Sequence, residues 1–446
     1  MKLILSLPHK QKAIILKKVK ILYYLVVKVL LKKGILSPST KKSFLLAYSY
    51  VILPKLIRKI TSLILNGNYN EIFTTIRSIL TRSLHFDKFP LFIAKLITIL
   101  NLANFLLSPK IPNKLLLHLV SSFLAAILTY PSFQRHLIEK KDRYYTLDLT
   151  LTLVVRAVDA LIFSPYFNEV GDAVLFILSS YVIMESWYFH PEKLTPDYRK
   201  WISSAADMDE DILQGFRYLN DGSVKYLNDT DTEEDVPKKQ KYFEEFCIKY
   251  GKNPKLGDLS IQKKLPCEVV HCFTYENCER HALYRFMRSF KMSLKLYGSV
   301  NVLLWIMFRR FKMPLKYIKS TIRSAIFLAS FSTLGWYGLC LVRKERLARL
   351  FPNVSQTTWD LLAPKVGGLL SGFSCFLEAP SRIKELSLFV APRALGTFVS
   401  PEINDKNLFY ESLAFSISFA ILVAFAKEKP GRVRGLVGRA LRIIFN

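Results

Sequence analysis

The chain has 446 residues, 51% of them hydrophobic, with a mean hydropathy of +0.20 and a formal net charge of +29. This apolar content argues against a soluble enzyme of two or three domains and favours a membrane protein. The charge would suit either nucleic acid or an anionic membrane surface. In residues 1–70 the basic side chains are interleaved with long apolar runs, which a nucleic-acid arm does not need, so we expect no nucleic-acid partner.

The first 42 residues are rich in Lys and contain no acidic residue. Their apolar core is not followed by the small-residue cleavage site of a secretory signal, and a mitochondrial presequence would be rich in Arg and Ser. We therefore expect residues 1–42 to form a basic, membrane-proximal helix.

Apolar runs near the roughly 20 residues that a bilayer requires recur along the chain. Each half also begins with a shorter and more basic apolar segment, at 43–65 and at 292–308. These patterns predict an all-α, polytopic membrane protein with eight to ten spans. The longer runs lie at 89–107, 115–130, 147–163, 172–190, 321–342, 363–379, 386–399 and 408–426.

The two halves resemble each other. Their first apolar segments align with Tyr48 on Tyr297, at an offset of 249 residues. The same offset places "TYPS" at 129–132 on "EAPS" at 378–381. One offset that serves two separate anchors favours an internal duplication over chance.

A third pair of segments extends the alignment after a gap of 12 residues, where "VVRAVDAL" falls on "APRALGTF" and Arg156 falls on Arg393. We infer two tandem multi-helix repeats, at 43–190 and 292–426, of the kind seen in many membrane-protein folds. The alternative is that leucine-rich helices align by composition alone.

A polar region separates the repeats. It consists of an acidic loop at 191–265, whose Asn- and Asp-rich stretches indicate turns or disorder, and a cysteine-rich linker at 266–291. A basic tail follows the second repeat at 427–446. If each repeat has an even number of spans, both termini and the loop lie on the cytosolic side, where basic residues gather.

The linker contains the stretch "LPCEVVHCFTYENCERH". Its thiols and imidazoles are borderline-soft donors that suit tetrahedral zinc. The C-x2-C pairs of zinc knuckles are absent, so plain thiols near a membrane and, less favoured, a disulfide are the alternatives. The candidate ligands of this possible structural zinc are Cys267, Cys272, Cys278 and His281, with His271 nearby. We expect no other cofactor.

The same linker runs into a basic helix that ends in "LKLYG", at 294–298. With Cys267 and Cys278, this pattern resembles the cysteine-rich segment of the transmembrane protein 135 family. The resemblance implies a following hydrophobic domain distantly similar to the Tim17/Tim22/Tim23 translocase family. It covers 267–426 well and 43–190 more weakly. It differs in the position of the cluster, which lies in the middle of this chain.

Small residues form a stripe in the run "KVGGLLSGFSCFLEAPSR". This spacing lets helix backbones approach closely in lipid, where no hydrophobic force drives helices together. Ordinary helix packing is the favoured interpretation, and a dimerisation or pore role is the alternative. The residues are Gly367, Gly368, Ser371, Gly372 and Cys375.

Charged residues also occur inside apolar runs, where an ion must face a partner or a water-filled cavity. Arg156 and Asp159 are three residues apart on a helix and so can pair. Arg156 and Arg393 occupy equivalent repeat positions and are candidates for binding an anionic headgroup or carboxylate. The alternative is that both lie at span ends and snorkel to the interface.

No P-loop, GxSxG, HExxH or Rossmann glycine motif is present, so we expect no enzyme. The resemblance implies an integral protein of the peroxisomal or mitochondrial membrane, linked to lipid and fatty-acid metabolism, solute transport or organelle dynamics. A component of a protein-translocation or membrane-insertion machine is the second hypothesis, and a membrane-bound lipid-modifying enzyme is the third. Expected partners are membrane lipids, with other organelle membrane proteins or a second copy of the chain as further candidates.

Overall fold

The structure, a computed structural model, describes residues 34–35, 37–65, 72–84, 88–140, 143–162, 168–227, 236–307, 314–343 and 350–445. These residues form helices joined by turns and loops, with no strand among them, which confirms the all-α prediction. The basic helix expected at 1–42 lies outside the described residues except at its end, where residues from Pro38 onward belong to the first described α-helix.

Among the described residues, five helices are long and apolar enough to cross a membrane, which supports a multi-pass membrane protein. They are α5 (Phe89–Leu107), α6 (Lys114–Glu139), most of α8 (Asn168–Phe189), most of α14 (Pro314–Val342) and α18 (Asp405–Glu428).

Three predicted spans are helical but are not among these five. The run at 147–163 forms α7 (Arg143–Ile162), which carries Asp148, Arg156 and Asp159. The runs at 363–379 and 386–399 fall on α16 (Gln356–Gly372) and α17 (Pro380–Gly396), which have 17 residues each. That is short of the roughly 20 residues needed to span a bilayer. Among the described residues, charge in α7 and the short lengths of α16 and α17 therefore keep these three helices out of the set of candidate spans.

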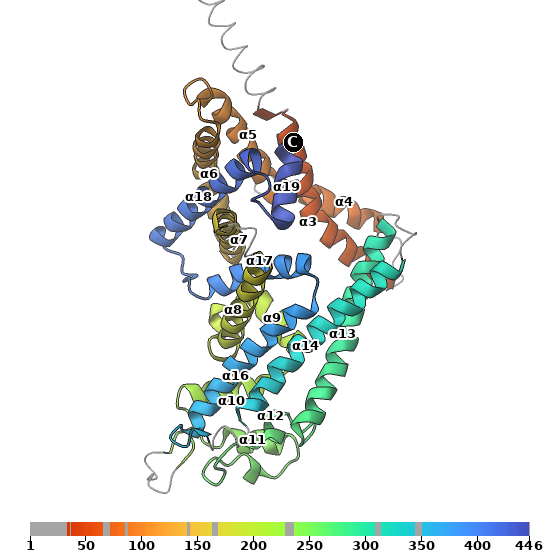
Figure 1. Cartoon of the computed structure of the whole chain (residues 1–446), viewed down its shortest axis with the longest axis vertical. Helices are drawn as coiled ribbons and strands as arrows, with labels where there is room; N and C mark the ends of the chain where they lie inside the picture. Colours follow the sequence, from red (N-terminus) through yellow and green to blue (C-terminus); the bar gives the residue numbers. More distant parts are fainter. Residues whose placement is uncertain are drawn as a thin grey trace, which may run out of the picture. The chain divides into compact units, whose positions relative to one another are not determined.

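The described helices pack as two units. The first unit contains α5, α6, α7 and α18, together with α3 (Pro38–Leu65), α4 (Ile72–Arg82) and α19 (Gly435–Phe445). In Figure 1, α18 lies beside α6, and α18 also packs on α7, while α5 packs between α3 and α6. Stacked rings from three helices form the centre of this unit, with Phe92 on Phe133 at 4.1 Å and Tyr130 on Phe415 at 3.9 Å between ring centroids.

Asparagine caps set where two of these helices begin. The Asn113 side chain accepts a hydrogen bond from the backbone N–H of Leu116, at 3.1 Å, and Asn404 does the same for Asn407, at 2.7 Å. Each bond satisfies a donor that would otherwise be unpaired at the first turn of a helix. The caps therefore fix the starts of α6 and α18.

The second unit is formed by residues 164–400. Its helices include α8, α14, α16, α17 and α13 (Cys278–Met307). Here α14 packs between α13 and α16, and α8 packs on α16 and α17 (Figure 1).

The polar region between the predicted repeats is more ordered than expected from its composition. It forms the helices η3 (Pro191–Lys193), α9 (Pro196–Ala206), α10 (Glu210–Asn220), α11 (Tyr242–Lys249), η5 (Pro254–Leu256) and α12 (Cys267–Val270). Ile212, Phe216 and Phe243 are fully buried in a core that continues onto α8, α14 and α16. The turn expected at 220–223 is present, and the acidic stretch at 228–235 lies outside the described residues.

This packing groups the helices differently from the predicted division at 43–190 and 292–426. The last helix of the predicted first repeat, α8, packs in the second unit. The last helix of the predicted second repeat, α18, packs in the first unit.

Candidate metal centre

The cysteine-rich linker folds as the short helix α12, a tight turn and the long helix α13. Within the turn, Cys272 and Phe273 have φ angles of 52° and 56°. This left-handed conformation costs a non-glycine residue on the order of 1 kcal/mol. It reverses the chain so that the N–H of Phe273 donates to the carbonyl of Glu268, at 2.8 Å. The reversal places His271, at the end of α12, beside Cys278, at the start of α13.

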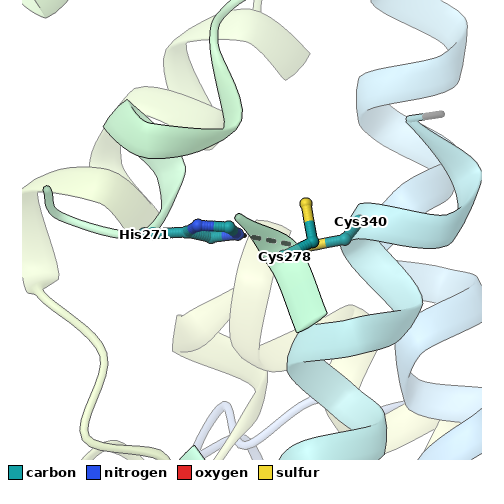
Figure 2. Close-up of side chains that lie close together, drawn as sticks. All are labelled: His271, Cys278 and Cys340. Atoms are coloured by element: carbon teal, nitrogen blue, oxygen red, sulfur yellow. Dashed lines mark hydrogen bonds between the residues drawn. The ribbon is translucent and has the colours of Figure 1, made fainter. Parts of the chain in front are cut away.

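Three potential metal ligands converge at this point. The nearest ring nitrogen of His271, the Cys278 Sγ and the Cys340 Sγ all lie within 4.8 Å of one another. Figure 2 shows the three side chains lying close together, with the His271 ring directed at the sulfur of Cys340. His271 Nε2 lies 3.1 Å from the Cys340 Sγ, and His271 and Cys340 are fully buried or nearly so.

A fourth donor lies against this cluster. Hydrogen-bond contacts with the thiols of Cys278 and Cys340 lower the pKa of Cys267 far below the usual value of a thiol. The thiol of Cys267 therefore lies against two of the three cluster residues, although its sulfur is not among the donor atoms that lie within 4.8 Å of one another.

The orientation of the His271 ring suits a metal ligand. Its Nδ1 lies 2.8 Å from the backbone carbonyl of Tyr275. Donation from Nδ1–H to that carbonyl leaves the lone pair of Nε2 directed at the sulfurs, which is the usual arrangement around metal-bound histidine. Burial lowers the pKa of His271, so the ring is held in the neutral form that ligation requires.

Two of the predicted ligands lie outside the cluster. The Sγ of Cys272 lies 4.0 Å from the Val270 carbonyl, and burial raises the pKa of this thiol to about 11. His281 stacks flat on the ring of His271, 4.0 Å away, and its Nε2 accepts a hydrogen bond from Arg285. Cys272 is itself one of the two left-handed residues of the turn, and His281 lies one turn along α13 from Cys278. His271 and Cys340 occupy the corresponding places in the cluster.

A buried ion pair ties the linker to the same helices. Just beyond α14, Arg343 lies 2.7 Å from the carboxylate of Asp360 on α16, and both side chains are almost fully buried. Asp360 also accepts a hydrogen bond from the hydroxyl of Tyr226, at 2.5 Å. The backbone of Leu265 is held at both ends, since its N–H donates to Tyr226 and its carbonyl accepts from Arg343. The linker is thus fastened to α14 immediately before Cys267.

Chemically, the cluster is compatible with a structural metal ion. Structural sites with tetrahedral geometry use four protein ligands, whereas catalytic sites keep one position open for water or substrate. With Cys267 included, the cluster offers four donors. It joins a helix of the membrane domain to the polar linker.

The predicted small-residue stripe lies at close approaches between helices of the second unit. A Cβ atom at Gly367 would lie 2.5 Å from the carbonyl oxygen of Gly335 on α14. A Cβ atom at Gly368 would lie 2.7 Å from the Cβ of Met184 on α8. A Cβ atom at Gly372 would lie 2.7 Å from the Cα of Ile177, also on α8. Ser371 and Cys375 are fully buried beside them.

The predicted pairing of Arg156 with Asp159 is replaced by a longer-range one. Asp159 forms an ion pair with Arg434, whose Nε lies 3.1 Å from a carboxylate oxygen. Arg156 is buried and donates to the backbone carbonyl of Arg434, at 3.4 Å. Arg393, in the second unit, lies over the rings of Phe389 and Tyr198, with its guanidinium carbon 3.9 Å and 5.5 Å from their centroids.

A second buried polar group in the first unit was not found from sequence. Glu411 on α18 forms an ion pair with Arg143 on α7, and both side chains are more than nine-tenths buried. Tyr130 on α6 donates to Glu411, at 2.7 Å, and lies 2.7 Å from the Thr150 hydroxyl. Glu411 could have been found from sequence because it is the only acidic residue in the apolar run of α18. A lone charge in such a run usually has a partner.

Comparison with protein-family models, curated proteins and solved structures finds no match for this chain. The resemblance to the transmembrane protein 135 family therefore remains a prediction from the linker motif.

Proposed function

We propose that the chain is a non-enzymatic, multi-pass protein of an organelle membrane that handles lipid-related solutes, and that a structural zinc ion fastens its polar region to its membrane helices. The observation that carries the zinc proposal is the convergence of Cys278, His271 and Cys340, with Cys267 against them. Three thiolates and one imidazole form a known tetrahedral zinc set. Soft thiolate ligands also disfavour magnesium and calcium, which prefer oxygen.

The ion's proposed role is structural because the protein would fill all four positions of a tetrahedral site if Cys267 supplied the fourth ligand. It would connect α12, α13 and α14 at one point, beside the Arg343–Asp360 ion pair. The polar helices α9 to α11 would then be held against the end of a candidate span. Since ligands bind only in the folded state, the binding free energy of the metal contributes to folding.

The experiment is metal analysis of the purified full-length protein by mass spectrometry, followed by chelation. We expect near-stoichiometric zinc, and a lower thermal midpoint after its removal that is restored by added zinc. Protein that is fully folded and free of zinc would refute the proposed centre.

The proposed architecture is two repeats that exchange their last helices. The offset that aligns Arg156 with Arg393 also places the start of α7 on the start of α17 and the start of α8 on that of α18. In the first unit α6 and α7 pack on α18, and in the second unit α16 and α17 pack on α8. Equivalent helices thus make equivalent contacts, which supports an internal duplication.

The organelle and the lipid link rest on the family resemblance. Imaging of tagged protein against peroxisomal and mitochondrial markers tests them, and a signal confined to the plasma membrane or nucleus would overturn the proposal. A component of a protein-translocation or membrane-insertion machine is the alternative, and copurification with import subunits would favour it.

A further inference from the structure

The second unit contains a partly enclosed apolar cavity of about 220 Å³. Its walls come from α8, α9, α13, α14 and α17. Large aromatic side chains dominate the lining, among them Phe176, Trp187, Trp201, Phe331, Trp336 and Phe389. An apolar cavity of roughly 150 Å³ is large enough for an aromatic ring and stays free of water, so this one has room for a larger apolar group.

The cavity is elongated along the helices. On α8 its lining extends from Phe176 to Tyr188, and on α14 from Phe327 to Trp336. At a rise of about 1.5 Å per residue these stretches measure roughly 18 Å and 14 Å. Ligand pockets for compact drug-sized molecules typically measure about 300–1,000 Å³. A long cavity below that volume suits one extended hydrocarbon chain better than two chains.

Polar atoms of the lining are bonded to the protein. The indole N–H of Trp187 donates to Ser203, at 3.1 Å, and that of Trp336 donates to the carbonyl of Ala206, at 3.1 Å. The hydroxyl of Ser180 donates to the Phe176 carbonyl, at 2.8 Å, and that of Ser332 accepts from Ser289, at 3.1 Å. The walls therefore present mainly hydrocarbon and ring surface to an occupant.

One end of the cavity is amphipathic. It is covered by α9, which follows the candidate span in α8 and carries the stacked rings of Tyr198 and Trp201. Tyr and Trp gather where membrane meets water. The Arg393 guanidinium lies over the rings of Phe389 and Tyr198, two of the lining residues. The Arg393 guanidinium also donates to the Phe389 carbonyl, so a positive charge lies beside two rings of the lining.

We propose that this cavity binds the hydrocarbon chain of a single-chain amphiphile with an anionic head, and that the head lies beside Arg393. A fatty acid and a lysophospholipid share this chemistry. The inference deepens the lipid-related function proposed above, and it rests on that function.

The test uses the full chain in detergent and measures quenching of tryptophan fluorescence by brominated palmitate. Trp187 and Trp336 are almost fully buried, so the bromine quenches them at close range only from inside the cavity. We expect saturable quenching that unlabelled palmitate reverses. A parallel titration with lysophosphatidic acid as competitor distinguishes the two sources of the anionic head.

Two variants locate the binding. Ala205→Phe places a ring in the cavity from α9 and should weaken binding at least tenfold, whereas Ser204→Phe, on the exposed side of α9, should leave it unchanged. Arg393→Gln should weaken palmitate about tenfold without changing the competition by palmityl alcohol, and Arg393→Lys should restore most of the affinity.

The outcomes separate this inference from the broader function. Saturable binding that Ala205→Phe does not change would overturn the cavity while leaving a lipid-linked role. Quenching that rises linearly with brominated palmitate, with no competition by either amphiphile, would overturn both. Equal effects of Arg393→Gln on palmitate and palmityl alcohol would overturn the placement of the anionic head.

Discussion

Cys340 is the residue that changes the chemistry of the cysteine-rich linker. It lies in the last turn of a candidate span, yet its thiol is 3.1 Å from the ring of His271. The linker alone offers two sulfurs and one imidazole to this cluster. The thiol of Cys340 adds a donor from a candidate span to the donors of the linker. It thereby connects the linker to α14.

Replacing Cys340 with Ser should abolish near-stoichiometric zinc binding, because a hydroxyl is a poor substitute for a thiolate on this metal. Cys272→Ser is the matched control, since Cys272 lies in the cysteine-rich linker but outside the cluster. Zinc content and thermal midpoint of both purified variants check the prediction. Equal zinc loss in the two variants would contradict the ligand assignment.

The buried pair of Arg143 and Glu411 makes a second prediction at this scale. Arg143→Met leaves Glu411 buried without its partner and should destabilise the first unit by about 3–5 kcal/mol. The double variant Arg143→Met/Glu411→Leu should recover most of that loss, because it removes both charges. Thermal unfolding in detergent of the unchanged protein, of Arg143→Met and of the double variant measures these changes in stability. A double variant no more stable than Arg143→Met would count against a desolvated ion pair.

At the residue scale, sequence identified the cluster but only part of its ligand set. Cys267 and Cys278 were recognisable because they lie within one short polar stretch. Cys340 was not, because it sits in an apolar run where a cysteine is indistinguishable from a small hydrophobic residue. The choice between His271 and His281 depends on a left-handed turn that spacing does not reveal.

At the scale of elements, the contact between α14 and α16 depends on glycine. A Cβ atom at Gly338 would lie 2.5 Å from the Cα of Gly367, closer than real atoms allow, whereas one at Gly335 would meet nothing nearer than 4.0 Å. Both glycines are on α14, so they make a matched pair.

Gly338→Ala should therefore lower the thermal midpoint, because the backbones must separate and lose packing. Gly335→Ala should be neutral or slightly stabilising, since Ala favours helix by up to about 1 kcal/mol over Gly. Differential scanning calorimetry of the two variants measures their thermal midpoints. A Gly338→Ala variant that is more stable than Gly335→Ala would refute the close approach.

Helical elements were predictable from apolar runs of the right length, and all five candidate spans overlap predicted ones. The polar helices α10 and α11 were not predicted, because an acidic composition hides a narrow apolar face. That face, which includes Ile212 and Phe216 of α10, is stable only because it packs on the membrane helices.

At the scale of the whole molecule, the first unit depends on the end of the chain. It is made from residues up to 163 and from 401 onward, whereas the second unit is continuous from 164 to 400. Hydrophobic patterns predict helices but not which helices pack together, so the placement of α8 in the second unit and of α18 in the first could not be derived from sequence.

Removing residues 401–446 should disrupt the first unit and spare the second, which contains all four proposed zinc ligands. We expect the truncated protein to keep its zinc and a protease-resistant fragment that begins after residue 163. If the repeats instead packed separately, the loss would fall on the second half and the zinc would be lost with it.

The packing of α18 with the early helices also sets an order of events during synthesis. Proteins usually fold from the N-terminus as the chain emerges. Here α5, α6 and α7 are made early but must wait for α18, while α8 is joined by α16 and α17 sooner. The later half of the chain therefore completes its unit first. The helix α7 can bury Arg143 against Glu411 only after α18 has been made.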